Sequence, residues 1–324
     1  MVDRDGRARD RGAVAKPAAA RPVRRVAAVV DPASIGFDES RKGELLAALA
    51  AAGAEVVVEE TTGGDLGQQA TRRALARNVD LVMAVGGDGT VMACATALAG
   101  ASVPLAVLPS GTGNLLAVNL DLPHDVEGVL EVALHGGRRR IDVGAIGPDR
   151  FVVMSGIGLD AAMLRHAGPA TKRRIGALPY ALRGLRQLAR PSTEYRISLD
   201  GLPQISRMGR GVLVANLGRL QGGLAVLPDA VPDDGRLDVG VIEKRSPGGW
   251  PRLAGRVLLG RGGVVGEPPP ELFRARRVEI ECRRPQATER DGEPGPRARR
   301  LVAEVLPGAL TVCVPPVRGA GGPR

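Results

Sequence analysis

LVMAVGGDGT, residues 81–90, is the stretch of sequence that decides the fold. Its first five residues are apolar and predict a buried strand, and the glycine-rich end predicts a loop where that strand stops. Glycines supply the permissive φ/ψ angles of a turn, but a turn needs neither the carboxylate of Asp88 nor the hydroxyl of Thr90. Because glycine-rich backbone can approach phosphate oxygens closely, this loop predicts phosphate contacts.

A second loop of the same kind, PSGTGN at residues 109–114, follows the next apolar run at 103–108. Two such loops at neighbouring strand ends predict a phosphate-binding crevice. The alternative is two tight turns without a ligand. The sequence has no GxxxxGK[ST] loop, and no GxGxxG opens its first helix, so neither a P-loop nor a conventional dinucleotide site is expected.

The pattern around these loops predicts an α/β fold. Strands are expected at 23–30, 55–59, 81–85 and 103–108, and helices at 38–52, 65–77 and 91–99. Alternating strands and helices predict βαβ units and a mostly parallel sheet. Ligands bind such sheets outside the carboxyl ends of the strands, where both loops fall.

Short alternating strands take over from about residue 141. They are expected at 151–154, 195–199, 211–216, 237–242, 277–282 and 310–314, with one helical insertion at 175–190. This predicts a disordered basic tail at 1–21, a nucleotide domain at 22–140 and a β-rich domain at 141–318. An open alternative is that the last strand, at 310–314, belongs to the sheet of the first domain.

Composition excludes several classes of protein. The 324 residues are 44% hydrophobic but only 2% aromatic, which predicts a core of Ala, Val, Leu and Ile. No uncharged apolar run reaches about 20 residues, so no spanning helix is expected. The basic N-terminus lacks the apolar region of a secretory signal, and three scattered cysteines fit neither a disulfide framework nor a zinc site. The cytoplasm is therefore the expected compartment.

The net charge of +10 is concentrated in clusters. Residues 1–25 hold eight Lys or Arg against three Asp, and residues 165–190 hold seven with no acid. Such clusters indicate an anionic partner, or simply solvated arginine. Leucines at helical spacing within 165–190 allow a membrane-surface helix, with a helix packed on the second domain as the favoured alternative.

Two acidic segments of the second domain carry further candidates. In LPDAVPDDGRL, residues 227–237, a turn at Asp234-Gly235 is favoured over a site for a hard cation. In Asp291-Gly292-Glu293, two carboxylates flank a glycine and could bind a metal or accept a proton from a hydroxyl, although a plain turn explains the same residues.

Taken in order, these motifs resemble the diacylglycerol kinase catalytic-domain family. They are GGDGT at 86–90, SGTGN at 110–114, SGIGLDA at 155–161, Asn216 with Gly222-Gly223, LPDAVPDDGRLDV at 227–239 and DGE at 291–293. The resemblance covers about residues 23–316. It implies an NAD kinase-like nucleotide domain, a C-terminal β-sandwich-like domain, and ATP-dependent phosphorylation of a lipid hydroxyl.

The resemblance also implies roles for single residues. Glu293 would be the proton acceptor, with Asp88 and Asp291 as its partners. The expected ATP contacts are Asp31, Ser34, Thr62, Gly86, Gly87, Asp88, Gly89, Thr90, Thr112 and Asn114. Asp234, with the carbonyls of Val231 and Arg236, resembles the family's Mg²⁺ site. The chain departs from the family at Leu115 and Val118, where Asp and Arg usually stand.

The sequence is therefore compatible with three functions. The favoured one is an ATP-dependent lipid kinase that converts diacylglycerol to phosphatidic acid at the inner face of the cell membrane, with a homodimer left open. The others are an NAD kinase-like enzyme for a soluble substrate and a non-catalytic nucleotide-binding regulator. No nucleic-acid partner is expected, because the sequence shows no nucleic-acid motif and no aromatic stacking platform.

Overall fold

The first part of the chain alternates strands and helices. The structure, a computed structural model, describes residues 23–34, 38–62, 65–158, 192–220, 225–242 and 272–316. The elements of the first part are β1 (Arg25–Val30), α1 (Glu39–Ala51), β2 (Glu55–Glu60), α2 (Gln68–Ala76), β3 (Leu81–Gly86), α3 (Asp88–Leu98), β4 (Leu105–Pro109), α4 (Leu115–Asn119) and α5 (Val126–His135). The predicted strands and the three predicted helices are confirmed.

One predicted boundary is wrong, because α3 begins at Asp88 rather than at residue 91. Extended Gly87 occupies the N-cap position, and Asp88 stands in the first turn. A carboxylate in the first turn interacts favourably with the positive end of the helix dipole. Most of the GGDGT motif therefore forms the start of a helix and not a free loop.

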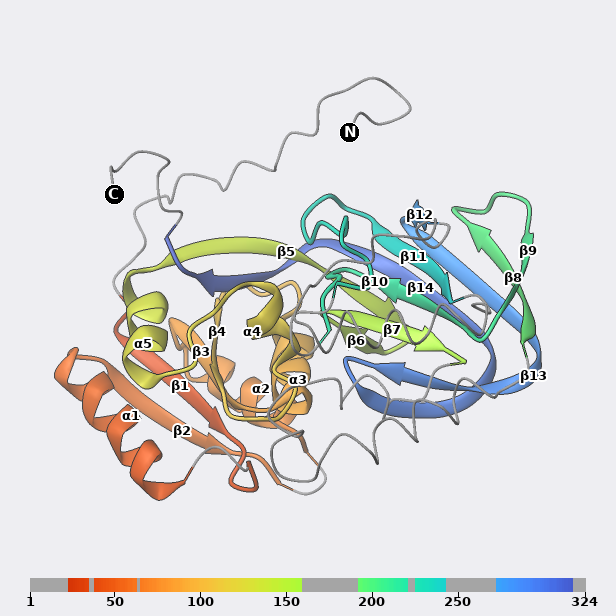
Figure 1. Cartoon of the computed structure of the whole chain (residues 1–324). Helices are drawn as coiled ribbons and strands as arrows, with labels where there is room; N and C mark the ends of the chain where they lie inside the picture. The colour runs from red at the N-terminus through yellow and green to blue at the C-terminus, as the bar shows by residue number, and fades with distance from the viewer. Residues whose placement is uncertain are drawn as a thin grey trace, which may run out of the picture.

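Helices cover both faces of the four parallel strands (Figure 1). Successive side chains of a strand point to opposite faces. Val26, Ala28 and Val30 of β1 accordingly join the core with α1 and α5, whereas Ala27 and Val29 join the core with α2 and α3. The strands β2, β1, β3 and β4 lie in that order, all parallel. Their carboxyl ends therefore meet at one edge of the sheet.

The second part is built from strands. They are β5 (Gly137–Ile146), β6 (Asp149–Phe151), β7 (Met154–Ile157), β8 (Thr193–Leu199), β9 (Ile205–Gly209), β10 (Gly211–Ala215), β11 (Leu237–Ile242), β12 (Leu272–Ala275), β13 (Arg277–Arg290) and β14 (Glu293–Val314). The single strand predicted at 151–154 is wrong, because the chain leaves the sheet between β6 and β7. The helix predicted at 175–190 lies outside the described residues.

β13 bends and so connects two layers of the second part. Its first half pairs with β8, and its last residues, Thr288 to Arg290, pair with β7. Register shifts lie between Glu281 and Gln286 and between Gln286 and Thr288. Such bulges bend a strand and increase its twist. The apolar side chains of β7, β8, β10, β11, β13 and β14 share one core, which gives this part its sandwich-like form.

β14 joins the two parts into one sheet of 14 strands (Figure 1). It pairs with β13 at its start and with β5 along its second half, and Val312 pairs in parallel with Leu105 of β4. The two domains expected from the sequence thus share a continuous backbone hydrogen-bonded sheet. No helix in the described ranges is long and apolar enough to cross a membrane.

Candidate functional site

The two glycine-rich segments lie side by side at the carboxyl ends of β3 and β4. Gly86 is in register with Pro109, and the Ser110 amide donates to the Gly86 carbonyl at 3.1 Å. The backbones approach so closely that a Cβ on Gly111 would lie 2.5 Å from the Cα of Gly87. Only glycine fits at residue 111, and its absence of a side chain brings the two backbones together.

The second segment folds around Asn114, which has a left-handed φ of 50°. Its side-chain oxygen accepts from the Gly111 amide at 3.1 Å, and its Nδ2 donates to the Gly111 carbonyl at 2.8 Å. This turn aims the Leu115 amide at Asp88, whose Oδ1 accepts from it at 2.6 Å. Leu115 therefore contributes a backbone donor here, while its side chain is buried.

A tight hairpin turn between β13 and β14 presents two further carboxylates, Asp291 and Glu293. Arg290 pairs with Glu293, and the two residues between them have φ values of 45° (Asp291) and 83° (Gly292). Positive φ at both central positions is typical of a type I′ turn and favours Asp-Gly. The turn carries Glu293 to α3, where a Cβ on Gly89 would lie 3.7 Å from Glu293 Oε1.

Asp291 fastens this hairpin to the link between β6 and β7. One carboxylate oxygen accepts from the Val152 amide at 2.7 Å, and the other accepts from the Val153 and Met154 amides, both at 2.8 Å. The side chain is 4% exposed. Because every bond it makes here is to backbone, we assign Asp291 a positioning role beside Asp88 and Glu293. These bonds also explain why the chain leaves the sheet after Phe151.

Residues from five segments of the chain surround a cavity of about 260 Å³. Its lining consists of Asp31, Leu66, Gly87, Asp88, Gly89, Thr90, Thr112, Gly113, Asp291 and Glu293. Eight of these ten residues were named from the sequence, and the structure brings them together from both parts of the chain. Leu66 and Gly113 were missed, because neither carries a reactive group that a sequence pattern could single out.

Two carboxyl groups of the cavity, Asp88 and Asp291, have raised pKa values, and burial is the main cause in both. Burial raises the pKa of Asp88 to about 7; the Leu115 amide acts against this, and the charges of Asp291 and Glu293 add to it. Burial likewise raises the pKa of Asp291 to about 6 against the three amides that bond it. A site with several close carboxylates is suited to receive a cationic or metal-bearing ligand, or to accept a proton.

Four predicted ATP contacts do not line this cavity. Ser34 lies behind it and shares a 2.7 Å hydrogen bond with the Ser110 hydroxyl, so it supports the second segment. Thr62 forms a bridge with Asp65. Gly86 and Asn114 shape the backbone, as described above. In this structure these residues shape the loops, and their contact with ATP stays a prediction.

The predicted Mg²⁺ ligands lie apart from the cavity lining. Asp234 Oδ1 accepts from the Arg236 amide at 3.0 Å, and its Oδ2 is 4.0 Å from Arg274 Nη1. Arg274 also bonds Asp238 at 2.8 Å. Within the described ranges, no group of three or more His, Cys, Asp or Glu could hold a metal ion. Arg274 pairs with both carboxylates here, so we derive no step from a metal at this site, and the predicted Mg²⁺ ligands stay a prediction.

Two buried carboxyl groups that fasten backbone turns were not identified from the sequence. Asp142 on β5 accepts from the amides of Gly235 and Gly308, both at 2.7 Å. Glu289 on β13 is fully buried, and its Oε2 accepts from the Gly292 amide at 3.1 Å. A single acidic residue in an otherwise ordinary strand carries no local signal, so the sequence alone could not have identified either one.

Replacing Glu289 with glutamine is expected to change how stability depends on pH. Burial raises the pKa of Glu289 to about 8, from 4.5 for the free side chain, and the charge of Asp291 adds to this. The folded state therefore holds a proton that the unfolded chain loses, so the free energy of unfolding falls as pH rises from about 4.5 to 8.

The titration of Glu289 should account for a fall of about 2 kcal/mol in the free energy of unfolding of the wild type from pH 6 to pH 8. Denaturant unfolding of wild type and Glu289→Gln at pH 6, 7 and 8 measures it. The variant should lose less stability over this range than the wild type. Equal slopes for both proteins would show that Glu289 does not hold the proton.

Comparison with known families covers nearly all described residues. A model described as "Diacylglycerol kinase catalytic domain" matches residues 25–146. A second, described as "YegS C-terminal NAD kinase beta sandwich-like domain", matches residues 152–314. These matches confirm the predicted fold class, an NAD kinase-like α/β part followed by a β-sandwich-like part.

Among curated relatives, a Pseudomonas aeruginosa protein named "Probable lipid kinase YegS-like" is 31% identical over 291 residues, covering 86% of this chain and 91% of its own. A Mycobacterium tuberculosis protein named "Diacylglycerol kinase" is 29% identical over 239 residues, covering 70% and 75%.

Two solved structures share the fold. A diacylglycerol kinase from Bacillus anthracis has a TM-score of 0.72 at 23% identity, covering 91% of this chain and 98% of its own. An NAD kinase from Archaeoglobus fulgidus, solved in complex with ATP, has a TM-score of 0.51 at 14% identity, covering 89% and 93%. With both family models matched in order along one sheet, the chain belongs to the diacylglycerol kinase catalytic-domain family of lipid kinases.

Proposed function

We propose that this protein transfers the γ-phosphate of ATP to the hydroxyl of diacylglycerol and so forms phosphatidic acid. The observation that carries the proposal is the shared cavity, in which Asp88 and Glu293 face two glycine-rich backbone segments. Backbone amides at a helix N-terminus suit phosphate oxygens, and carboxylates suit the hydroxyl proton. Donor and acceptor chemistry are thus supplied from opposite walls of one site.

The reaction would run as an in-line displacement. The acceptor oxygen forms a bond to the γ-phosphorus while the bond from phosphorus to the ADP oxygen breaks, and Glu293 takes the hydroxyl proton. Thr90, Thr112 and the backbone of residues 87–89 would position the phosphates. ATP would enter as its Mg²⁺ complex, which would offset the negative charge of the phosphates and of the carboxylates that line the cavity.

A lipid acceptor is supported by the relatives named "Diacylglycerol kinase" and "Probable lipid kinase YegS-like". Leu66 lines the cavity and is 52% exposed, so we propose that an acyl chain of the lipid passes over it. We propose that the protein meets this lipid at the membrane surface without spanning it. The basic helix proposed for residues 165–190 lies outside the described residues.

NAD kinase chemistry is the second candidate, because the first part shares its fold with an NAD kinase solved with ATP. The two functions predict different products from the same donor. A labelled-phosphate assay with diacylglycerol, sphingosine, ceramide, undecaprenol and NAD separates them.

We expect label in the organic phase with diacylglycerol, and none when Mg²⁺ is chelated. Label appearing only in NAD would support the second candidate. No transfer to any acceptor, with ATP still bound, would support a regulator and contradict both kinase proposals.

A further inference from the structure

A groove lined by arginines lies next to the catalytic cavity. It has a volume of about 460 Å³ and runs between α2, α3 and the turn that joins β5 to β6. Leu66 lines both the groove and the cavity. A second hollow of about 340 Å³ shares Arg72 and Arg150 with it and extends the groove toward Leu306. We call these two hollows the arginine groove.

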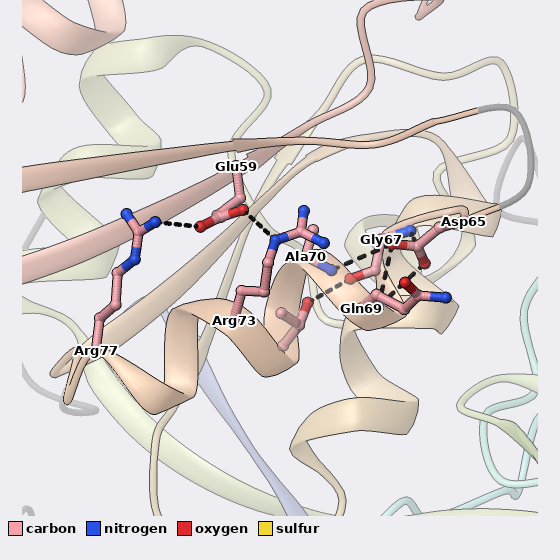
Figure 2. A network of polar contacts seen from close by, with 8 residues as sticks. Glu59, Asp65, Gly67, Gln69, Ala70, Arg73 and Arg77 are labelled. Atoms are coloured by element: carbon pink, nitrogen blue, oxygen red, sulfur yellow. Dashed lines mark hydrogen bonds and ion pairs between the residues drawn. The ribbon is translucent and has the colours of Figure 1, made fainter.

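The carboxylates of the arginine groove are already satisfied. Asp149 forms an ion pair with Arg290. Asp65 accepts from the amides of Gly67, Gln69 and Ala70 at 3.1–3.2 Å, at the start of α2 (Figure 2). Burial raises the pKa of Asp65, but these amides outweigh it and hold the pKa below its usual value. Neither carboxylate is therefore engaged with Arg72 or Arg150.

Arg72 differs from two arginines near it, Arg73 of α2 and Arg77 at the C-cap of this helix. Arg73 and Arg77 both reach Glu59 on β2, at 2.8 Å and 3.4 Å (Figure 2). Arg72 precedes Arg73 by one residue, which is about 100° around a helix, and it lines the groove instead. Among the described residues it has no carboxylate within ion-pair distance.

Arg150 lines the opposite wall, from β6. Its Nη1 donates to the carbonyls of Gly147 and Asp149, both at 3.0 Å, so the guanidinium is held against its own turn. Carbonyl acceptors orient a guanidinium but do not neutralise it. Within the described ranges, Arg150 too has no carboxylate at ion-pair distance, and the three arginines that line the groove outnumber its two carboxylates.

We propose that the arginine groove is a second anion site, which binds a phosphate group between Arg72 and Arg150. Guanidinium groups pair with phosphate through two parallel hydrogen bonds, and Gln68, on the same wall as Arg72, adds an amide donor. The phosphate can belong to free phosphate or to a lipid headgroup. The site needs no turnover, so the proposal stands apart from the proposed kinase function.

The test compares two double variants with the same loss of charge. Arg72→Ala/Arg150→Ala removes the groove cations, and Arg24→Ala/Arg299→Ala removes two exposed arginines that line neither hollow. Binding of inorganic phosphate is measured by calorimetry. The glycine-rich segments are intact in both variants, so a difference between them reports the groove.

We expect the groove variant to bind phosphate at least about tenfold more weakly, the effect of losing one charge-assisted hydrogen bond or more. The control should match the wild type. Equal affinities in all three proteins, or equal losses in both variants, would overturn the proposal. If the alanine variant does not fold, Arg72→Lys/Arg150→Lys keeps the charge but loses the paired hydrogen bonds and should still bind more weakly.

Sedimentation with vesicles distinguishes the source of the phosphate. Vesicles contain phosphatidylcholine alone or with phosphatidylglycerol, at fixed salt. If the groove variant alone also loses binding to the anionic vesicles, the phosphate is that of a lipid headgroup. If it loses only inorganic phosphate, the site takes a soluble phosphate. Unchanged binding in both arms would contradict the proposal.

Discussion

Replacing Glu293 with glutamine is expected to lower kcat for phosphoryl transfer by about 10²–10⁴-fold, the usual contribution of a positioned general base. Glu293 stands on a two-residue turn that points it at the start of α3. Glutamine keeps the shape of the side chain but cannot accept a proton. KM for ATP should change little, because the variant leaves the phosphate-facing backbone of residues 87–89 in place.

Glu304→Gln is the matched control for this experiment. Glu304 lies on the same strand, β14, and its side chain is 48% exposed, in an ion pair with Arg277. It should retain wild-type kcat, and both variants should unfold at temperatures close to that of the wild type. Near-normal transfer by the Glu293 variant would remove Glu293 from the chemistry.

Replacing Asp88 with asparagine is expected to reduce transfer to a similar degree and to change its pH profile. Burial raises the pKa of Asp88 to about 7. As the pH falls through 7, wild-type Asp88 gains a proton and its negative charge is lost, so kcat should fall with it. Asparagine is neutral at every pH and should leave a low rate without that inflection. Rates measured between pH 6 and 8 test both points.

Asp121→Asn provides the control for Asp88. Asp121 is remote from the cavity lining and has a left-handed φ of 51°, a conformation that asparagine also tolerates. Its profile should follow that of the wild type. A wild-type profile that is flat from pH 6 to 8 would show that Asp88 does not titrate there. A wild-type rate in the Asp88 variant would contradict its role altogether.

The core of the site could be predicted because its signals are local. Each glycine-rich segment follows an apolar run, and neighbouring parallel strands bring their carboxyl ends together. Asp291-Gly292 presented two alternatives in the sequence, a plain turn or a reactive pair. The structure shows the turn, with positive φ at both residues, and this turn brings Glu293 to α3, while its reactive role stays a prediction.

The rest could not be predicted because it depends on contacts between distant residues. Asp291 bonds amides almost 140 positions away, at residues 152–154. Amides carry no sequence signature, so no pattern marks their partner. The arginine near Asp234 is likewise 40 residues further on, and only the fold shows that Arg274 neutralises the carboxylate expected to bind Mg²⁺.

β14 also determines when the sheet can be completed during synthesis of the chain. It follows every other described strand in the chain, yet both halves of the sheet depend on it. During synthesis, the edges of β4 and β5 that pair with β14 therefore stay unpaired until β14 has left the ribosome. Contacts of such long sequence separation slow folding and expose strand edges to other chains. A nascent chain stalled before residue 293 would lack Glu293 and would also be prone to aggregate.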